Sequence, residues 1–219
     1  GKYSKEPYYV RITQNGKPDA GEKIELNNGA GFFDERDIVD AGFLELVRLG
    51  IKSPHDKIIQ NSIKVIDQII KVETPNGDGF YRYNHDGYGE MDDGRRWNWD
   101  GKYTGKGRLW ALLSGERGQY EIALSENAGG IPVSEPKKTS MTLEQYAKGL
   151  ARNRLSTMAN FANEGLMIPE QVWDKAEVPK ADSQFSPNLK FGEGTGSATP
   201  LAWSMAQFIR LAVNLKAGK

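Results

Sequence analysis

The sequence predicts an all-α fold of roughly five helices connected by long loops. Hydrophobic residues recur at helical spacing in five segments, residues 35–49, 56–72, 109–124, 142–163 and 199–215. Long stretches rich in Gly, Asp, Pro and aromatic residues separate them, chiefly residues 77–107, 126–140 and 174–198. Loops of this length within a compact domain usually carry function. We therefore expect a helical scaffold whose functional site is built from its loops.

The N-terminal half of the chain contains two of these helices. Before them, residues 8–13 alternate in the manner of a strand and Asn15-Gly16 marks a turn. The first helix is expected to run to Leu49 and to end at Gly50. Asp56 can cap the second helix by accepting hydrogen bonds from its free N–H groups. Four isoleucines at helical spacing then form its buried stripe: Ile59, Ile63, Ile66 and Ile70.

The other three helices have their own start and stop signals. Gly115 and Gly118 are expected to interrupt the third helix. The fourth has Thr142 as its N-cap and Gln145 at the capping-box position. The fifth is expected to begin at Thr199-Pro200, with Thr as the cap and Pro in the first turn.

Composition narrows the classes of function. The chain has 219 residues, enough for one domain or part of a larger one. Lys plus Arg and Asp plus Glu number 29 each, so neither nucleic acid nor an anionic membrane surface is favoured as a partner. The absence of cysteine excludes disulfides, a thiolate nucleophile and Cys-ligated zinc. The two histidines, His55 and His85, are far apart, and we expect no metal site and no cofactor.

The segment 168–174 carries the most specific chemical signal. It places Glu170 close to Trp173 on a loop between two strongly helical segments. An enzyme that cleaves sugars needs a fixed carboxylate for proton transfer, and a flat apolar surface can hold a pyranose ring. A Pro-Glu pair after a helix more often lies on the solvated surface, so this segment alone is weak evidence for a catalytic residue. Two further tracts, residues 107–120 and 197–204, strengthen the interpretation.

The three tracts, in this order, resemble the C-terminal part of the catalytic domain of bacterial glucoamylases and their glucodextranase relatives, glycoside hydrolase family 15. The resemblance implies that residues 1–219 form the C-terminal portion of an (α/α)6 toroid, with the N-terminal portion absent from this chain. It implies exo-acting, inverting hydrolysis of α-1,4 bonds in α-glucan oligosaccharides, releasing β-glucose. Hydrolysis of α-1,6 bonds and a non-catalytic helical sugar-binding module are the alternatives.

The resemblance also assigns roles to residues. It makes Glu170 the general base and Ser197 the hydrogen-bond donor that orients it. It implies that Arg108 binds hydroxyl groups of the glucose at the first subsite and that Tyr120 forms an aromatic platform. Glu116 and Arg117 could form either a polar floor of the site or a buried ion pair. The other substrate-binding candidates lie in the same tracts: Trp110, Gln171, Trp173 and Trp203.

Family members also have an aromatic loop near the mouth of the site, which residues 81–89 match. Their general acid is a Glu that follows a Trp, whereas none of the five tryptophans here precedes Glu. We therefore expect the general acid to lie on the absent N-terminal part of the enzyme, which makes that part a required partner. We expect no useful hydrolysis by this chain alone. The chain starts at Gly1 and shows no signal peptide. We expect a truncated N-terminus and a secreted bacterial protein, with a cytoplasmic location left open.

Overall fold

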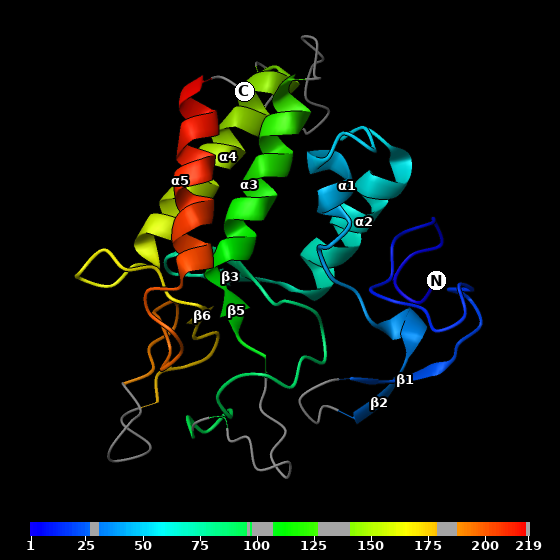
Figure 1. Ribbon diagram of the computed structural model, residues 1–219, viewed down its shortest axis with the longest axis horizontal. Helices are drawn as coiled ribbons and strands as arrows, with labels where there is room; N and C mark the ends of the chain where they lie inside the picture. The colour runs from blue at the N-terminus through cyan, green and yellow to red at the C-terminus, as the bar shows by residue number, and fades with distance from the viewer. Residues whose placement is uncertain (27–30, 96, 98–106, 127–140, 179–187, 218–219) are drawn as a thin grey trace.

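The computed structural model describes residues 1–26, 31–95, 97, 107–126, 141–178 and 188–217. Within these residues, five α-helices form most of the scaffold (Figure 1). They are α1 (Leu44–Arg48), α2 (Lys57–Ile69), α3 (Ala111–Glu126), α4 (Leu143–Asn160) and α5 (Ala202–Ala217). One 3-10 helix spans Glu35–Asp37. The short strands are β1 (Lys23–Leu26), β2 (Gly31–Asp34), β3 (Lys71–Thr74), β4 (Gly77–Phe80), β5 (Leu109–Trp110) and β6 (Gln171–Val172).

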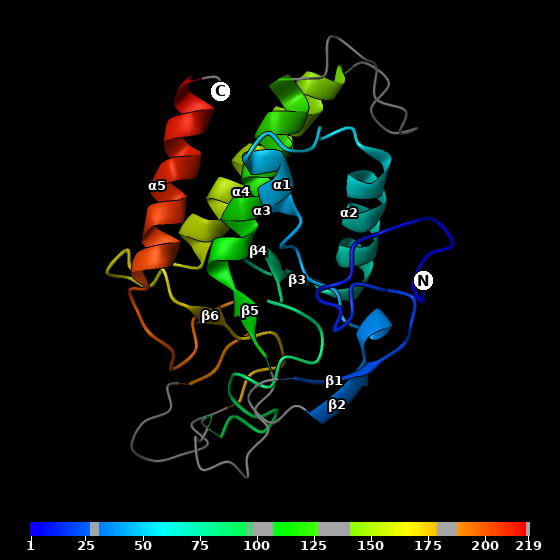
Figure 2. The same cartoon turned by 45° about the vertical axis from the view of Figure 1, so that its right-hand side comes forward.

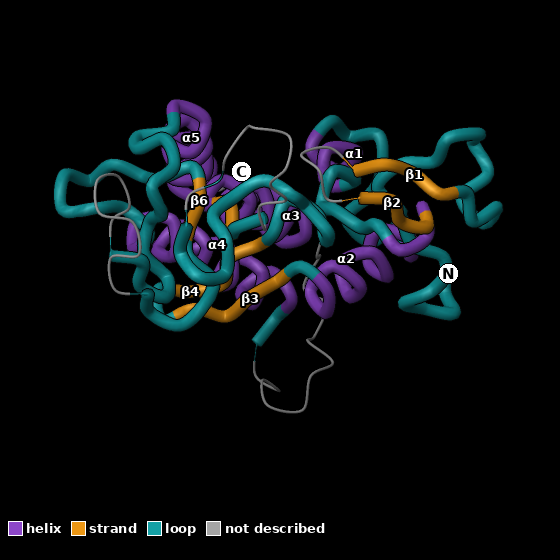
Figure 3. Tube along the Cα trace, turned by 90° about the horizontal axis from the view of Figure 1, so that it is seen from below, coloured by secondary structure: helices purple, strands orange, loops and turns teal. Residues whose placement is uncertain are grey.

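The helices alternate in direction. Helices α1, α3 and α5 run one way and α2 and α4 run back, so that successive helices form hairpins (Figures 1 and 2). Helix α3 packs against α4, α5 and α1. Strands β3 to β6 gather with the described loop residues 81–95 and 188–201 at the end where α3 and α5 begin, which Figure 3 shows from below. The scaffold therefore presents its loops at the positive ends of two helix dipoles.

The expectation of an all-α fold needs a correction. Three antiparallel pairs accompany the helices in the described part of the chain: β1 with β2, β3 with β4, and β5 with β6. Residues 8–13 do not form the expected strand, because the N-terminal hairpin forms later, at β1 and β2. The pair β3–β4 also ends α2 at Ile69 rather than at residue 72, since the chain turns into a strand there.

Predictions about two helix caps and one buried helix face are confirmed. Asp56 caps α2 through hydrogen bonds from the N–H groups of Ile58 and Ile59, at 2.8 and 3.3 Å. Thr142 and Gln145 form both hydrogen bonds of the capping box of α4. The predicted isoleucine stripe of α2 is buried in the core.

Helix α3 is continuous, so the expected interruption at its glycines is wrong. A Cβ at Gly115 would lie 2.6 Å from Met158 of α4, and one at Gly118 would lie 2.8 Å from Leu211 of α5. The glycines thus let α4 and α5 approach the α3 backbone closely. Tertiary packing offsets the cost of about 1 kcal/mol per glycine that an isolated helix would carry.

Two helices begin later than expected. Residues 38–43 do not join α1, because Ile38 accepts a hydrogen bond from Arg11 and Asp40 bridges to Tyr83. Helix α5 begins at Ala202, and its first turn is closed by the bond from the Met205 N–H to the Leu201 carbonyl. In the described residues, no helix is both long and apolar enough to cross a bilayer.

Candidate active site

The strand pair β5–β6 brings the first two sequence tracts together. It sets Trp110 opposite Gln171, which places Glu170 beside the start of α3. The third tract joins them through backbone hydrogen bonds. The Glu170 N–H donates to the Ala198 carbonyl at 2.9 Å, and the Leu201 N–H donates to the Ile168 carbonyl at 3.0 Å. The three tracts that carried the resemblance therefore converge at one end of the helices.

The carboxyl group of Glu170 is half-buried and held by its neighbours. Burial raises its pKa above the ordinary value, and the negative charge of Glu90 adds to that rise. A hydrogen bond from the Ala198 backbone and the positive charge of Arg82 act in the opposite direction. Tyr88 also hydrogen-bonds this carboxylate, and burial raises the pKa of the Tyr88 hydroxyl, which keeps it a donor.

Arg82, whose charge acts on Glu170, also lines a small cleft. The cleft encloses about 260 Å³, and its walls include Arg82, Trp110 and Trp203. Trp203 stands in the first turn of α5 with 60% of its surface exposed, so its ring is available to a ligand. Arg82 lies 5.1 Å from the Trp110 ring centre and 5.6 Å from that of Tyr88. Arg82 and Tyr88 thus connect the cleft to Glu170, which does not itself line it.

Arg82, Tyr88 and Glu90 were not among the predicted site residues, although the aromatic loop, residues 81–89, contains the first two. Arg82 is fixed by two hydrogen bonds of 2.8 Å to the carboxylate of Asp86. This bidentate pair of hydrogen bonds holds the guanidinium in one orientation. The bridge of Tyr81 to Leu109 brings the loop against β5, which is a long-range pairing that no local pattern indicates.

Ser197 and Gln171 hold the loop instead of facing the cleft. The Ser197 hydroxyl accepts hydrogen bonds from the Gln171 N–H at 2.9 Å and from Thr195 at 3.1 Å. The expected bond from Ser197 to the Glu170 carboxylate is not among the described contacts, where Tyr88 takes that place. Gln171 is buried and donates to the Tyr88 carbonyl at 3.1 Å. Both residues therefore position Glu170 through the backbone.

Arg108 and Trp173 are fully buried, and their expected contact with sugar stays a prediction. Arg108 is fully buried and donates to Asp174 at 2.6 Å, to Asp92 at 3.1 Å and to the Glu90 carbonyl at 3.0 Å. Its guanidinium lies 4.3 Å from the centre of the Trp173 ring, and Trp173 is fully buried too. The pair forms a packed support beneath the loop, because every guanidinium nitrogen is already engaged.

Arg117 and Tyr120 bond to α2 and to the loop that precedes it. Arg117 makes two hydrogen bonds to Asp67 of α2, at 2.7 and 2.9 Å, so its described ion-pair partner there is Asp67 and not Glu116. Tyr120 is buried in the core and donates its hydroxyl to the Pro54 carbonyl at 3.2 Å. It is therefore not a platform for sugar in this structure.

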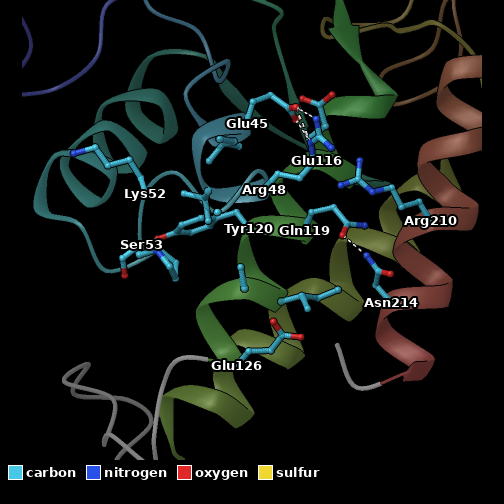
Figure 4. A pocket seen from close by; sticks show the side chains of 16 residues that line it. Glu45, Arg48, Lys52, Ser53, Glu116, Gln119, Tyr120, Glu126, Arg210 and Asn214 are labelled. Atoms are coloured by element: carbon cyan, nitrogen blue, oxygen red, sulfur yellow. Dashed lines mark hydrogen bonds and ion pairs between the residues drawn. The ribbon is translucent and has the colours of Figure 1, made fainter.

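Glu116 borders two hollows. It lines the small cleft and also a cavity of about 600 Å³ between α1, α3 and α5 (Figure 4). Burial raises the pKa of its carboxyl to about 7, and Glu45 adds to the rise while Arg210 and Arg48 oppose it. A carboxyl that titrates near neutral pH makes the stability of this region depend on pH.

We expect Glu116→Gln to change the pH dependence of unfolding of residues 1–219. Because the folded pKa is raised from 4.5 to about 7, the protonated form is favoured in the folded state. That stabilisation is fully present below pH 4.5 and is lost as the pH rises through 7. The variant should therefore gain up to about 3 kcal/mol over the wild type between pH 5 and pH 8.5 in urea unfolding. Exposed Glu25→Gln is the control, and parallel curves for wild type and Glu116→Gln would contradict the expectation.

Among the described residues, no group of three or more His, Asp and Glu side chains is placed to hold a metal ion. The polar groups around Glu170 are instead one arginine, one tyrosine and a second carboxylate. Such a set can move a proton and hold hydroxyl groups.

Comparison with known proteins agrees with this geometry. A family model described as Glycosyl hydrolases family 15 matches residues 3–213. A glucoamylase of Clostridium sp. (strain G0005) is 42% identical over 204 residues, covering 93% of this chain and 23% of that protein. A crystal structure of a bacterial glucoamylase complexed with acarbose superposes with a TM-score of 0.74 at 40% identity, covering 97% of this chain and 25% of that one. The chain thus spans about a quarter of these relatives.

Proposed function

Because this chain belongs to glycosyl hydrolases family 15, we propose that it carries the general base of an inverting, exo-acting α-glucosidase, and that Glu170 is that base. The substrate is the non-reducing end of an α-1,4-linked glucan. Glu170 removes a proton from a water molecule, which attacks the anomeric carbon on the face opposite the leaving group. The product is β-glucose.

One observation carries this proposal. Glu170 is a half-buried carboxylate, held by Tyr88 and Ala198, and the charge of Arg82, which lines a cleft with an exposed indole, acts on it. An inverting base must be ionised, fixed in direction and close to a sugar-binding surface. The contacts of Tyr88 and Ala198 favour the ionised form and fix its direction. Arg82 and Trp203 supply donors and an apolar face for the glucosyl ring.

The rest of the catalytic site would lie on another part of the enzyme. The alternating helices α1 to α5 would form part of an (α/α)6 barrel, and the general acid would lie outside residues 1–219. The fraction of each relative that this chain spans, about a quarter, supports that division. A partner polypeptide, the N-terminal part of the same enzyme, is then needed to complete the site.

Glucose release tests the division of roles. Residues 1–219 alone should release no glucose from maltose, whereas the complete polypeptide should release it. Measuring isomaltose in parallel separates α-1,4 from α-1,6 cleavage. Release of glucose by residues 1–219 alone would contradict the placement of the acid elsewhere.

The charge of Glu90 should be visible in the pH profile of the complete enzyme. Glu90 is buried, with one carboxylate oxygen 3.1 Å from the Gly196 N–H and the other unpartnered among the described residues. Its charge raises the pKa of Glu170, so Glu90→Gln should lower that pKa. A base works only when deprotonated, and the acid limb of kcat/KM should therefore move to lower pH. Exposed Glu177→Gln serves as control, and an unmoved acid limb in Glu90→Gln would count against Glu170 as the base.

A further inference from the structure

A second cavity lies on another side of the loop that holds Glu170. It encloses about 590 Å³ between the β3–β4 turn, the C-terminal end of α4 and residues 188–199. It shares no lining residue with the cleft of Trp110 and Trp203. Its volume falls within the range of about 300–1,000 Å³ that is usual for small-molecule sites.

In each of three asparagines in its wall, one of the two polar amide atoms hydrogen-bonds the protein, and the other has no described partner. Asn76 Nδ2 donates to the Gly192 carbonyl at 2.9 Å, and Asn160 Nδ2 donates to the Asn76 carbonyl at 3.3 Å. Asn163 Oδ1 accepts from the N–H groups of Gly165 and Met167, both at 3.0 Å. These bonds leave two amide oxygens and one amide nitrogen in fixed orientations, without a described partner. Fixed acceptors beside a fixed donor suit hydroxyl groups, which both donate and accept.

The rest of the wall favours a neutral ligand. Lys190 lies 3.7 Å from Glu193, which leaves Glu164 as the other charged group of the lining. Pro169 and Met167 add apolar surface. With one lysine beside one glutamate, a second carboxylate, several amides and some apolar area, the wall suits a polyhydroxylated molecule better than an anion.

We propose that this cavity is a second binding site for an α-glucan chain, separate from the cleft of Trp110 and Trp203. The ligand class rests on the proposed function. The cavity wall includes Thr195 and Ser197, whose hydroxyls hold the loop at Gln171. A glucan chain in the cavity therefore contacts the same segment that positions the base.

Calorimetric titration with maltoheptaose tests the second site. The complete enzyme with Glu170→Gln is used so that the ligand is not consumed. Two binding events are expected. Asn160→Ala should weaken one of them about 3–10-fold, the usual worth of one neutral hydrogen bond. Asn153→Ala, an exposed asparagine on the same helix but outside the cavity, is the matched control and should change neither.

The outcomes separate this inference from the proposed function. A single binding event, or two events that Asn160→Ala leaves unchanged, overturns the second site. An event that is sensitive to Asn160→Ala supports the site even if the event at the cleft is missing, and in that case the proposed function of the cleft fails instead.

Discussion

Glu170→Gln in the complete enzyme is expected to lower kcat about 10²–10⁴-fold, the usual worth of a general base. Glutamine keeps the shape of the side chain and can still accept hydrogen bonds from Tyr88 and the Ala198 backbone, but it cannot take a proton from water. KM should change little, because the proposed sugar-binding groups Arg82, Trp110 and Trp203 are intact in the variant. Steady-state kinetics on maltose measures both constants.

The matched control is Glu177→Gln, which lies seven residues later on an exposed stretch and lines neither cavity. It should leave kcat unchanged. An unchanged kcat in Glu170→Gln would remove this carboxylate from the role of base. A rise in KM alone would make Glu170 a binding residue.

Arg108→Met is expected to destabilise residues 1–219 by about 3–5 kcal/mol, because it leaves a buried carboxylate without its counter-ion. Arg108 and Asp174 are 2.6 Å apart, with side chains 0% and 1% exposed. Tyr81 also hydrogen-bonds Asp174, and an isolated hydroxyl cannot neutralise the charge. Urea unfolding of the purified chain measures the loss.

Two comparisons make this prediction specific. Arg95→Met breaks an exposed pair with Asp93 and should cost at most about 1 kcal/mol. Adding Asp174→Asn to Arg108→Met should recover part of the lost stability, since the buried charge is then gone. If Arg108→Met instead raised KM of the complete enzyme with no loss of stability, the expected sugar contact would be right and the structural role wrong.

Local signals predicted the helices whose ends depend on nearby residues. Asp56 and the capping box of Thr142 and Gln145 act within one helical turn, so the sequence specifies them directly. The start of α1 depends on Ile38 and Asp40, which bond to residues far away in the chain, and no local pattern contains that information.

The candidate site shows the same division. Glu170 became a candidate because its carboxylate and the neighbouring tracts stand in one recognisable order. The burial of Arg108 and Trp173 could not, because burial depends on the whole packing around β5 and β6. Arg82 was missed for a related reason. It lies 88 residues before Glu170 in the sequence, so no local pattern indicates that its charge acts on the Glu170 carboxylate.

Chemical rescue tests the placement of Glu170 most directly. In the complete enzyme carrying Glu170→Ala, azide can occupy the space left by the carboxylate and attack the anomeric carbon where water would have attacked. A maltose digest with azide should then regain rate and form β-glucosyl azide, detected by proton NMR, and the wild type should form none. Formation of α-glucosyl azide, or no azide product and no rescue, would contradict a base on that face of the sugar.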